Sequence, residues 1–425
     1  MRRTIEIFGK IDGITILLYL FLVFFGWINL YSSVYNEVYE VASVFDLSTM
    51  YGKQLLFIGV SLFIAFVILI IDWRFFDTLS FVFYGITIIS LIAVLLFGVE
   101  INGAKSWFQI GDWLIQPSEF AKFITALALA KMLSLNKKNL FSFKSIIRSY
   151  AIVLIPFILI IWQKDMGTAL VFTSFILVFY REGLSGDVLI ILLILFSLVF
   201  LSLIIEETNL WKFSVFITSI IIIIYYFSSN RVRSIKISSI VAIISNGMIF
   251  STGYLYNNLL APHQIKRINV FFGNTDDPQG AEWSTHQAEV AIGSGRFFGK
   301  GFLNGTQTRL DFVSEPETDY LFCTIGEEWG FLGSFIFLLV FTTLLLRIIF
   351  LAEKQKSQFC RVYGYSVACI LFIHLMLNIS MIIGLAPTVG IPLPFISYGG
   401  SSLISFTILI FIFLNLNSYR MEILR

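Results

Sequence analysis

The sequence contains few charged residues. Lys, Arg, Asp and Glu make up 13% of its 425 residues, whereas about a quarter is usual in a soluble domain. Hydrophobic residues reach 57%, and the mean hydropathy is +0.87. This balance excludes a water-soluble fold and indicates a protein with many membrane-spanning segments. The formal net charge of +2 points to no particular partner.

Cysteine is also scarce. Cys323, Cys360 and Cys369 have neither paired spacing nor the spacing of metal ligands. We therefore interpret them as thiols that pack within the membrane. A cleavable signal peptide is not expected, because the first apolar run is long and no small-residue cleavage site follows it. This run is predicted to remain as the first spanning helix.

Long apolar runs dominate what remains of the sequence. A membrane-spanning helix needs about 20 apolar residues. Suitable runs occur near residues 12–31, 55–71, 77–98, 118–134, 147–162, 167–180, 186–205, 212–228, 237–255, 331–351, 364–383 and 401–417. Since the sixth and the twelfth are short, we predict an all-α polytopic membrane protein with about 10–12 transmembrane helices.

The positions of Lys and Arg predict the orientation of these helices. Loops rich in the two residues stay in the cytoplasm. They gather at both termini and in the joints 131–149, 229–236 and 352–363. Their alternation along the chain places both termini inside. Four unusual segments then share the outer face: 99–117, 163–166, 384–400 and the long polar stretch that ends near residue 330.

That polar stretch, residues 263–333, is the only long segment that is not plainly membrane-spanning. It carries ten of the 27 acidic residues and a dense run of glycines. We treat residues 1–425 as one integral membrane domain. Within it, residues 256–330 are predicted to form a large extracytoplasmic loop before the last three helices, and we expect the chemistry of the protein to take place at this loop.

Two neighbouring carboxylates in the loop are candidates for acid–base chemistry. Asp276 and Asp277 stand before Pro278, which restricts Asp277 to an extended conformation. One of two adjacent carboxylates holds a proton more readily than an isolated carboxylate does, and this property suits a general base. The alternative interpretation is a solvated turn, which is common for the pattern Asp-Pro-x-Gly.

Two further patterns in the loop are candidates for ligand binding. Five glycines fall between Gly293 and Gly305, and a glycine-rich backbone can approach an anion closely, with Arg296 and Lys300 adding positive charge. Flexible turns are the alternative explanation of these glycines. Further on, an acidic cluster offers oxygen ligands for a divalent cation, with ordinary solvation by water as the alternative explanation. Its acids are Glu315, Glu317 and Asp319, and Thr318 lies among them.

Ionisable residues also occur inside the predicted spans, where they are costly and usually mark function. Pro117 suits the first turn of a helix. Glu119 and Lys122 then lie on one face, either as a structural ion pair or as part of a site. The positive end of this helix points outward, which favours a phosphate there. Asp165 lies at the next helix boundary predicted for the outer face, where it is either a helix cap or a ligand contact.

The segment 384–402 is rich in proline and glycine at the entrance to the last helix. An irregular backbone at membrane depth persists only where it lines a cavity or is buried in protein. The helix that follows it runs inward from the outer face, so a second positive helix end is expected at the same place.

Together these segments resemble the SEDS family of bacterial cell-wall polymerases, which serve rod shape (RodA), division (FtsW) and sporulation (SpoVE). The resemblance is greatest to the RodA branch. It covers most of the chain outside residues 181–255, where extra helices are expected relative to the family. The matching residues include Gln116-Pro117-Ser118-Glu119, Lys122, Asp165, Gln264, Arg267, Asp277-Pro278, Gly280, Gln287, the run from Ala291 to Gly305, Thr318-Asp319, Gly326-Glu327-Glu328 and the block from Gly390 to Ser401.

The resemblance implies an inverting glycosyltransferase that polymerises lipid II into peptidoglycan glycan strands for cell elongation and shape. It implies Asp277 as the catalytic residue. Substrate-binding candidates are Glu119, Lys122, Asp165, Arg267, Arg296, Lys300, Glu315, Thr318, Asp319 and Ser397. No organic cofactor is expected, whereas Mg²⁺ or Mn²⁺ is a candidate ion with unknown ligands.

The implied location is the bacterial cytoplasmic membrane, with a class B penicillin-binding protein as partner and no nucleic acid. The sequence departs from the family at Glu317, which stands where a histidine is usual, and at Glu282-Trp283-Ser284. Two alternatives to a polymerase are a lipid II transporter and a scaffold that recruits a transpeptidase. A transporter requires polar groups through to the cytoplasmic face, whereas the distinctive residues gather on the outer side.

Overall fold

The computed structural model describes residues 11–35, 43–101, 103–111, 113–135, 143–205, 209–226, 231–260, 262–272, 281–310, 312–313 and 316–420. The chain divides into two compact units, of which the first comprises residues 1–178 and 276–425 and the second residues 179–275. The second unit contains the region 181–255 in which extra helices are expected.

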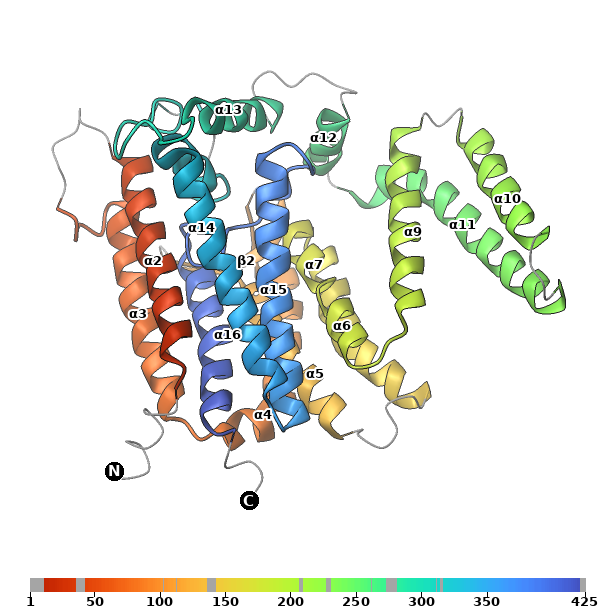
Figure 1. Ribbon diagram of the computed structural model, residues 1–425, viewed down its shortest axis with the longest axis horizontal. Helices are drawn as coiled ribbons and strands as arrows, with labels where there is room; N and C mark the ends of the chain where they lie inside the picture. The colour runs from red at the N-terminus through yellow and green to blue at the C-terminus, as the bar shows by residue number, and fades with distance from the viewer. Residues whose placement is uncertain are drawn as a thin grey trace. The chain divides into compact units, whose positions relative to one another are not determined.

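The first unit is a bundle of helices (Figure 1). Before the second unit it contains α2 (Gly13–Val34), α3 (Met50–Ile70), α4 (Trp73–Phe97), α5 (Pro117–Leu135), α6 (Phe143–Trp162) and α7 (Met166–Phe172). The short helix α8 (Phe175–Arg181) leads out of the unit. After the second unit follow α13 (Ala281–Ser294), α14 (Leu321–Glu353), α15 (Gln358–Ile382) and α16 (Gly400–Ser418). The second unit consists of α9 (Gly186–Ile204), α10 (Leu210–Tyr226), α11 (Arg231–Leu259) and α12 (Pro262–Phe271).

These helices are formed by long apolar runs of the sequence, and polar capping residues determine where several of them begin. The side chains of Asp12, Thr49 and Asp72 accept hydrogen bonds from backbone N–H groups in the first turns of α2, α3 and α4. Such caps satisfy donors that have no partner within a helix. In Figure 1, α2 begins and α16 ends at the same end of the bundle, while α13 lies across the opposite end.

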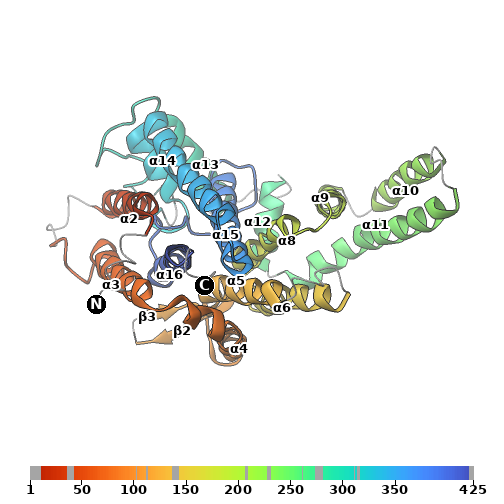
Figure 2. The ribbon, with the colours of Figure 1, turned by 60° about the horizontal axis from the view of Figure 1, so that its bottom comes forward.

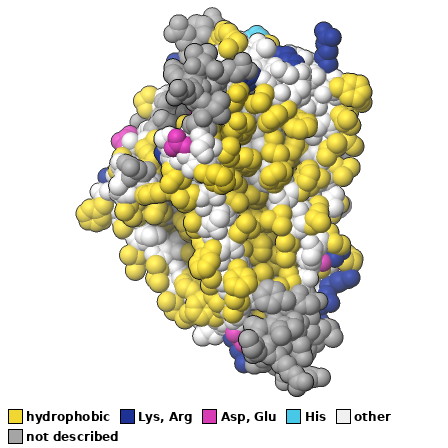
Figure 3. All heavy atoms as spheres, turned by 90° about the vertical axis from the view of Figure 1, so that its left-hand side faces the viewer, with side chains coloured by type: hydrophobic (Ala, Val, Ile, Leu, Met, Phe, Trp, Pro, Cys, Tyr) yellow, Lys and Arg dark blue, Asp and Glu magenta, His cyan; other side chains and the backbone are white. Residues whose placement is uncertain are grey.

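The prediction of an all-α polytopic membrane protein is confirmed. Among the described residues, seven helices are long and apolar enough to cross a membrane, and three shorter apolar helices accompany them. Helices at the periphery of the bundle, such as α2 and α3, expose large apolar side chains, among them Leu17, Phe24 and Phe63. Figure 3 shows hydrophobic side chains covering the middle of one face, with charged side chains toward its ends. This distribution matches a lipid-facing surface between two aqueous phases.

Helix α16 forms the centre of the first unit. Figure 2 shows it between α3 and α15, with α5 beside it. Every residue from Leu409 to Ser418 is buried. Near its end, Asn415 donates to the carbonyl groups of Ile68 and Ile71, each over 2.8 Å, where α3 finishes. The polar side chains of this helix therefore satisfy backbone groups of its neighbours.

One short piece of β structure was not predicted. Residues 99–115 form an antiparallel meander of β1 (Val99–Ile101), β2 (Ala104–Ile110) and β3 (Trp113–Ile115) between α4 and α5. The backbone N–H of Lys105 also donates to the carbonyl of Gln163 over 3.0 Å. Aromatic and branched residues in this stretch favour paired strands, and pairing satisfies backbone groups that an irregular loop would leave open.

The span expected at residues 167–180 is broken into α7 and α8 at Thr173 and Ser174. Both residues donate their backbone N–H groups to carbonyls three positions earlier, which tightens the turn and ends α7. The Thr173 hydroxyl also donates to the carbonyl of Leu170 over 2.6 Å. A local hydrogen bond of this kind competes with continuation of the helix.

The glycine-rich segment from Gly295 to Gly305 packs against the start of α14. Lys300 and Gly301 donate their backbone N–H groups to the carbonyls of Glu327 and Glu328, each over 3.0 Å. Helix α14 is kinked at Gly330, which has non-helical torsion angles with φ 64°. The predicted span at 331–351 therefore corresponds to the part of α14 after the kink.

The Glu327 carboxylate holds this segment in place. It accepts from the Lys300 ammonium over 2.6 Å. It also accepts from the backbone N–H groups of Thr306, Gln307 and Thr308 over 2.8 to 3.1 Å. The glycines there serve close packing, since a Cβ on Gly299 would lie 2.0 Å from the Glu328 carbonyl oxygen.

Replacing Gly299 by alanine is therefore expected to destabilise the protein. The residue has φ +81° in addition to the close backbone contact, so we expect a loss of at least about 2 kcal/mol of unfolding free energy. Gly293→Ala is the matched control, because nothing lies within 4 Å of its Cβ position in α13. Thermal unfolding in detergent measures both variants. Equal melting temperatures for the two would contradict this packing.

Candidate functional site

A buried ion pair lies at the start of α5. The helix begins at Pro117, as its sequence predicts, so Glu119 and Lys122 share one face. The Lys122 Nζ donates to the Glu119 Oε2 over 2.8 Å, and the two side chains are only 1% and 3% exposed. Moving a charge from water into a protein interior costs several kcal/mol unless partners compensate it. The remaining contacts of the pair show how the surrounding helices supply that compensation.

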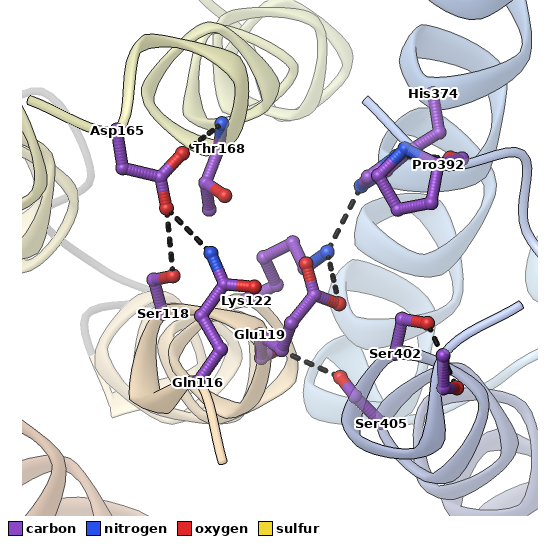
Figure 4. Close-up of polar contacts among 11 residues, drawn as sticks. Gln116, Ser118, Glu119, Lys122, Asp165, Thr168, His374, Pro392, Ser402 and Ser405 are labelled. Atoms are coloured by element: carbon purple, nitrogen blue, oxygen red, sulfur yellow. Dashed lines mark hydrogen bonds and ion pairs between the residues drawn. The ribbon is translucent and has the colours of Figure 1, made fainter. Parts of the chain in front are cut away.

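Two helices from the end of the chain complete the surroundings of Lys122. The ammonium lies 3.0 Å from the Nε2 of His374 on α15 and 4.5 Å from the centre of the Phe406 ring on α16. Figure 4 shows the Lys122 side chain pointing between Glu119 and His374. The Ser405 hydroxyl donates to the backbone carbonyl of Glu119 over 2.7 Å. Helices α5, α15 and α16 thus meet at a single cation.

Asp165 lies beside this pair and joins α7 to α5. One carboxylate oxygen accepts from the backbone N–H of Thr168 over 3.0 Å, so the residue is a helix cap, one of the two interpretations of its sequence position. The other oxygen accepts from the side chains of Gln116 and Ser118 over 2.7 and 3.0 Å. The residues that precede Glu119 in the sequence therefore bring Asp165 to the same end of α5 (Figure 4).

The proline-rich segment before α16 is fastened to α15 by two side chains one helical turn apart. His374 Nδ1 lies 3.3 Å from the carbonyl oxygen of Pro392. Asn378 donates to the carbonyl of Ile391 over 2.7 Å and to that of Asp319 over 2.8 Å. The backbone N–H of Tyr398 donates to the carbonyl of Glu317 over 2.9 Å. Residues 316–320 and 390–399 are consequently held together next to the buried pair.

The other candidate residues have different surroundings. Lys300 pairs with Glu327, whereas Arg296 is exposed and its carbonyl accepts from the Phe331 N–H over 2.8 Å. The Ser397 hydroxyl accepts from the backbone N–H of Leu393 over 2.8 Å and closes a turn. Thr318 and Asp319 lie in the turn 316–319.

Three of the candidates are not part of the first unit's described site. Asp277 and Glu315 lie outside the described residues, as does Asp276. Arg267 lies in α12 of the second unit. Among the residues that the structure describes, no group of three or more His, Cys, Asp or Glu side chains has the arrangement of a metal site.

The sequence reasoning missed the contribution of the last two helices. His374, Ser405 and Phe406 all contact the pair on α5, yet they lie more than 250 positions away in the chain. His374 carried a usable signal, because an ionisable residue inside an apolar span is costly and usually functional. Nothing in the pattern around Ser405 and Phe406 distinguishes them from ordinary residues of a buried helix.

The fold and this site define a polytopic membrane protein with a compensated ion pair inside its helix bundle. The family described as cell cycle protein, FTSW_RODA_SPOVE, matches residues 13–211 and 188–422. The chain belongs to this family.

Individual relatives match most of the chain. It is 30% identical to the peptidoglycan glycosyltransferase RodA of Treponema pallidum, over 92% of this chain and 94% of the relative. It is also 30% identical to the stage V sporulation protein E of Bacillus subtilis, over 96% and 97%. The peptidoglycan glycosyltransferase MrdB of Escherichia coli is 30% identical over 76% and 73%.

Solved structures share the fold at lower sequence identity. A chain of a peptidoglycan synthase complex that coordinates polymerization and crosslinking has a TM-score of 0.70 and 23% identity, over 97% of this chain and 99% of that one. The rod shape determining protein RodA of Thermus thermophilus has a TM-score of 0.62 and 23% identity, over 96% and 97%. The likeness to these structures extends over both units.

The buried pair predicts a specific pattern of stability. Glu119→Gln or Lys122→Met alone leaves one charge without its partner, and such a change costs about 3–5 kcal/mol. The double variant removes both charges, so we expect it to recover most of that loss. Thermal unfolding in detergent of the wild type, both single variants and the double variant measures the coupling. Losses that simply add would show that the two side chains do not form a pair.

Proposed function

We propose that the chain is a peptidoglycan glycosyltransferase that polymerises lipid II into glycan strands for cell elongation and shape. The observation that carries this proposal is the family match along nearly the whole chain, together with a positively charged group held at the start of α5. Relatives that match this chain over most of their own length are named peptidoglycan glycosyltransferases.

The reaction joins two lipid-linked sugars. The 4-hydroxyl of one lipid II attacks the anomeric carbon of the other, and the bond from that carbon to the lipid diphosphate breaks. Displacement of an α-linked diphosphate to form a β-1,4 bond inverts the anomeric centre. The hydroxyl proton passes to a base, and the diphosphate leaves with the bonding electron pair.

Asp277 is the proposed base. A single carboxylate next to the acceptor hydroxyl is sufficient for an inverting reaction, and general-base catalysis supplies about 10²–10⁴-fold. The remaining acceleration must come from positioning and from stabilisation of the charge that develops on the leaving group. Asp277 belongs to the segment that connects α12 with α13, and α13 packs on the start of α14.

The leaving diphosphate requires a cation, and Lys122 is the proposed one. Its charge is balanced by Glu119 while no substrate is bound, so the site stays stable between reaction cycles. Helix α16 contacts the first turn of α5 through Ser405, near its own start, and the N-termini of both helices are proposed to contribute partial positive charge. A Mg²⁺ or Mn²⁺ ion, held by acidic side chains within the segment 256–330, is a further proposed source of positive charge for the leaving diphosphate.

The distribution of buried charge supports an enzyme over a transporter. Among the described residues, the buried charged side chains are Glu119, Lys122, Glu327 and Glu328. All four lie within the first turns of α5 or before the kink of α14. The buried positions of α5 after Lys122 are apolar apart from Thr125. A path for a polar headgroup through the whole bundle would require charged or polar side chains along that helix as well.

The proposed location is the bacterial cytoplasmic membrane, with both termini in the cytoplasm. Helices α2 and α16 support it, since the first begins and the second ends at the same end of the bundle (Figure 1). A class B penicillin-binding protein is the proposed partner, because the matching complex couples polymerization with crosslinking. Lipid II is the proposed substrate, and its lipid tails account for an enzyme that is embedded in the bilayer.

Polymerisation of lipid II by the purified protein tests the proposal. We expect Asp277→Asn to reduce the rate by about 10²–10⁴-fold, as removal of a general base does. Asp276→Asn is the matched control and is expected to have a smaller effect. Wild-type rates from a folded Asp277→Asn protein would contradict the assignment of the base. Absence of polymerisation by the wild type, alone and with its partner, would favour a scaffold or a transporter.

A further inference from the structure

His374 is a buried histidine that none of the proposed reaction steps uses. It lies on α15, is 1% exposed and has no water-facing edge. Both ring nitrogens nevertheless have polar neighbours: Nε2 lies 3.0 Å from the Lys122 Nζ, and Nδ1 lies 3.3 Å from the Pro392 carbonyl oxygen. Its ring also packs edge-on against Phe406, with 4.9 Å between ring centres.

These neighbours determine which nitrogen carries the hydrogen. A carbonyl oxygen can only accept, so Nδ1 must be the N–H donor to Pro392. A charged lysine can only donate, so Nε2 must be the acceptor. The histidine is therefore neutral, with its hydrogen on Nδ1. A doubly protonated ring would place a second cation 3.0 Å from the ammonium.

The same helix turn also fixes the backbone next to the site. Asn378, four residues after His374, holds the carbonyls of Ile391 and Asp319. Consecutive carbonyls of the proline-rich segment are thus bound by two side chains of α15, and only His374 extends the connection to Lys122. Phe395 in that segment has φ 70°, a conformation that a non-glycine residue adopts only when its surroundings hold it there.

We propose that His374 is a positioning residue that aims the Lys122 ammonium. By accepting one hydrogen bond it keeps the ammonium between Glu119 and the 391–392 backbone, so that the cation does not turn wholly toward Glu119. Glu119 and His374 then accept two of the three ammonium hydrogens, and the third, on the side of the Phe406 ring, is the one proposed to bind an anionic group. The inference rests on the proposed function, in which that anionic group is the diphosphate of the substrate.

Two conservative substitutions separate the two contacts. Gln places an amide oxygen near the position of Nε2 and can still accept from Lys122. Asn places its amide near the position of Nδ1, so it can reach Pro392 but not Lys122. We expect His374→Gln to keep kcat within about threefold of the wild type, and His374→Asn to lower kcat by on the order of tenfold with little change in KM, since a misdirected cation affects mainly the transition state.

The assay is lipid II polymerisation by purified protein in detergent, with folding checked by thermal unfolding. Met376→Leu is the control on the same helix, because this side chain is 52% exposed and points away from the site. It is expected to leave kcat and KM unchanged. Equal kcat for His374→Gln and His374→Asn, at whatever level, would overturn the proposal, because the contact with Lys122 would then make no difference.

A second measurement does not depend on activity. In a double-mutant cycle of His374→Asn with Lys122→Met, the shifts in melting temperature are expected to be non-additive, as they are for side chains in direct contact. Additive shifts would remove the link on which the proposal rests. If the cycle showed coupling but the wild-type protein had no polymerase activity, the proposed function would fail and the contact between His374 and Lys122 would stand. If activity were present but independent of His374, only the positioning role would fail.

Discussion

The burial of a lysine ammonium inside an apolar bundle is the constraint on which the rest of this structure depends. An uncompensated charge at that depth would cost several kcal/mol, so α5 itself and the last two helices supply partners. Glu119 provides the opposite charge, while His374 and Phe406 come from α15 and α16. If these helices separated, Lys122 would lie in an apolar environment without its partners. A polar site of this kind therefore requires a rigid bundle around it.

Buried polar side chains also hold the irregular segments that precede α14 and α16. The Glu327 carboxylate accepts hydrogen bonds from Lys300 and from three successive backbone N–H groups, and this holds the glycine-rich segment against α14. Asn378 joins residue 319 to residue 391. The first contact places irregular backbone against the start of α14, and the second holds residues 319 and 391 near His374, which contacts Lys122 on α5. Both irregular segments are thus held in position by buried side chains.

The sequence predicted much of the fold because the spanning helices are apolar and long. Pro117 at the start of α5, the pairing of Glu119 with Lys122 and the cap at Asp165 also followed from local spacing. The break between α7 and α8, the strands at residues 99–115 and the kink at Gly330 did not, since each depends on a few hydrogen bonds. His374, Ser405 and Phe406 lie far from α5 in the chain, and only the packing of α15 and α16 brings them there.

The charge of Lys122 is the centre of the proposed chemistry, and its role can be separated from its contribution to stability. The protein carrying both Glu119→Gln and Lys122→Met contains no unpaired charge at this place, so it is expected to fold. The rate of lipid II polymerisation by this purified double variant is the decisive measurement. We expect it to fall by at least about 100-fold, as removal of a group that stabilises developing charge does. A folded double variant that polymerises lipid II at the wild-type rate would show that the buried pair is only structural.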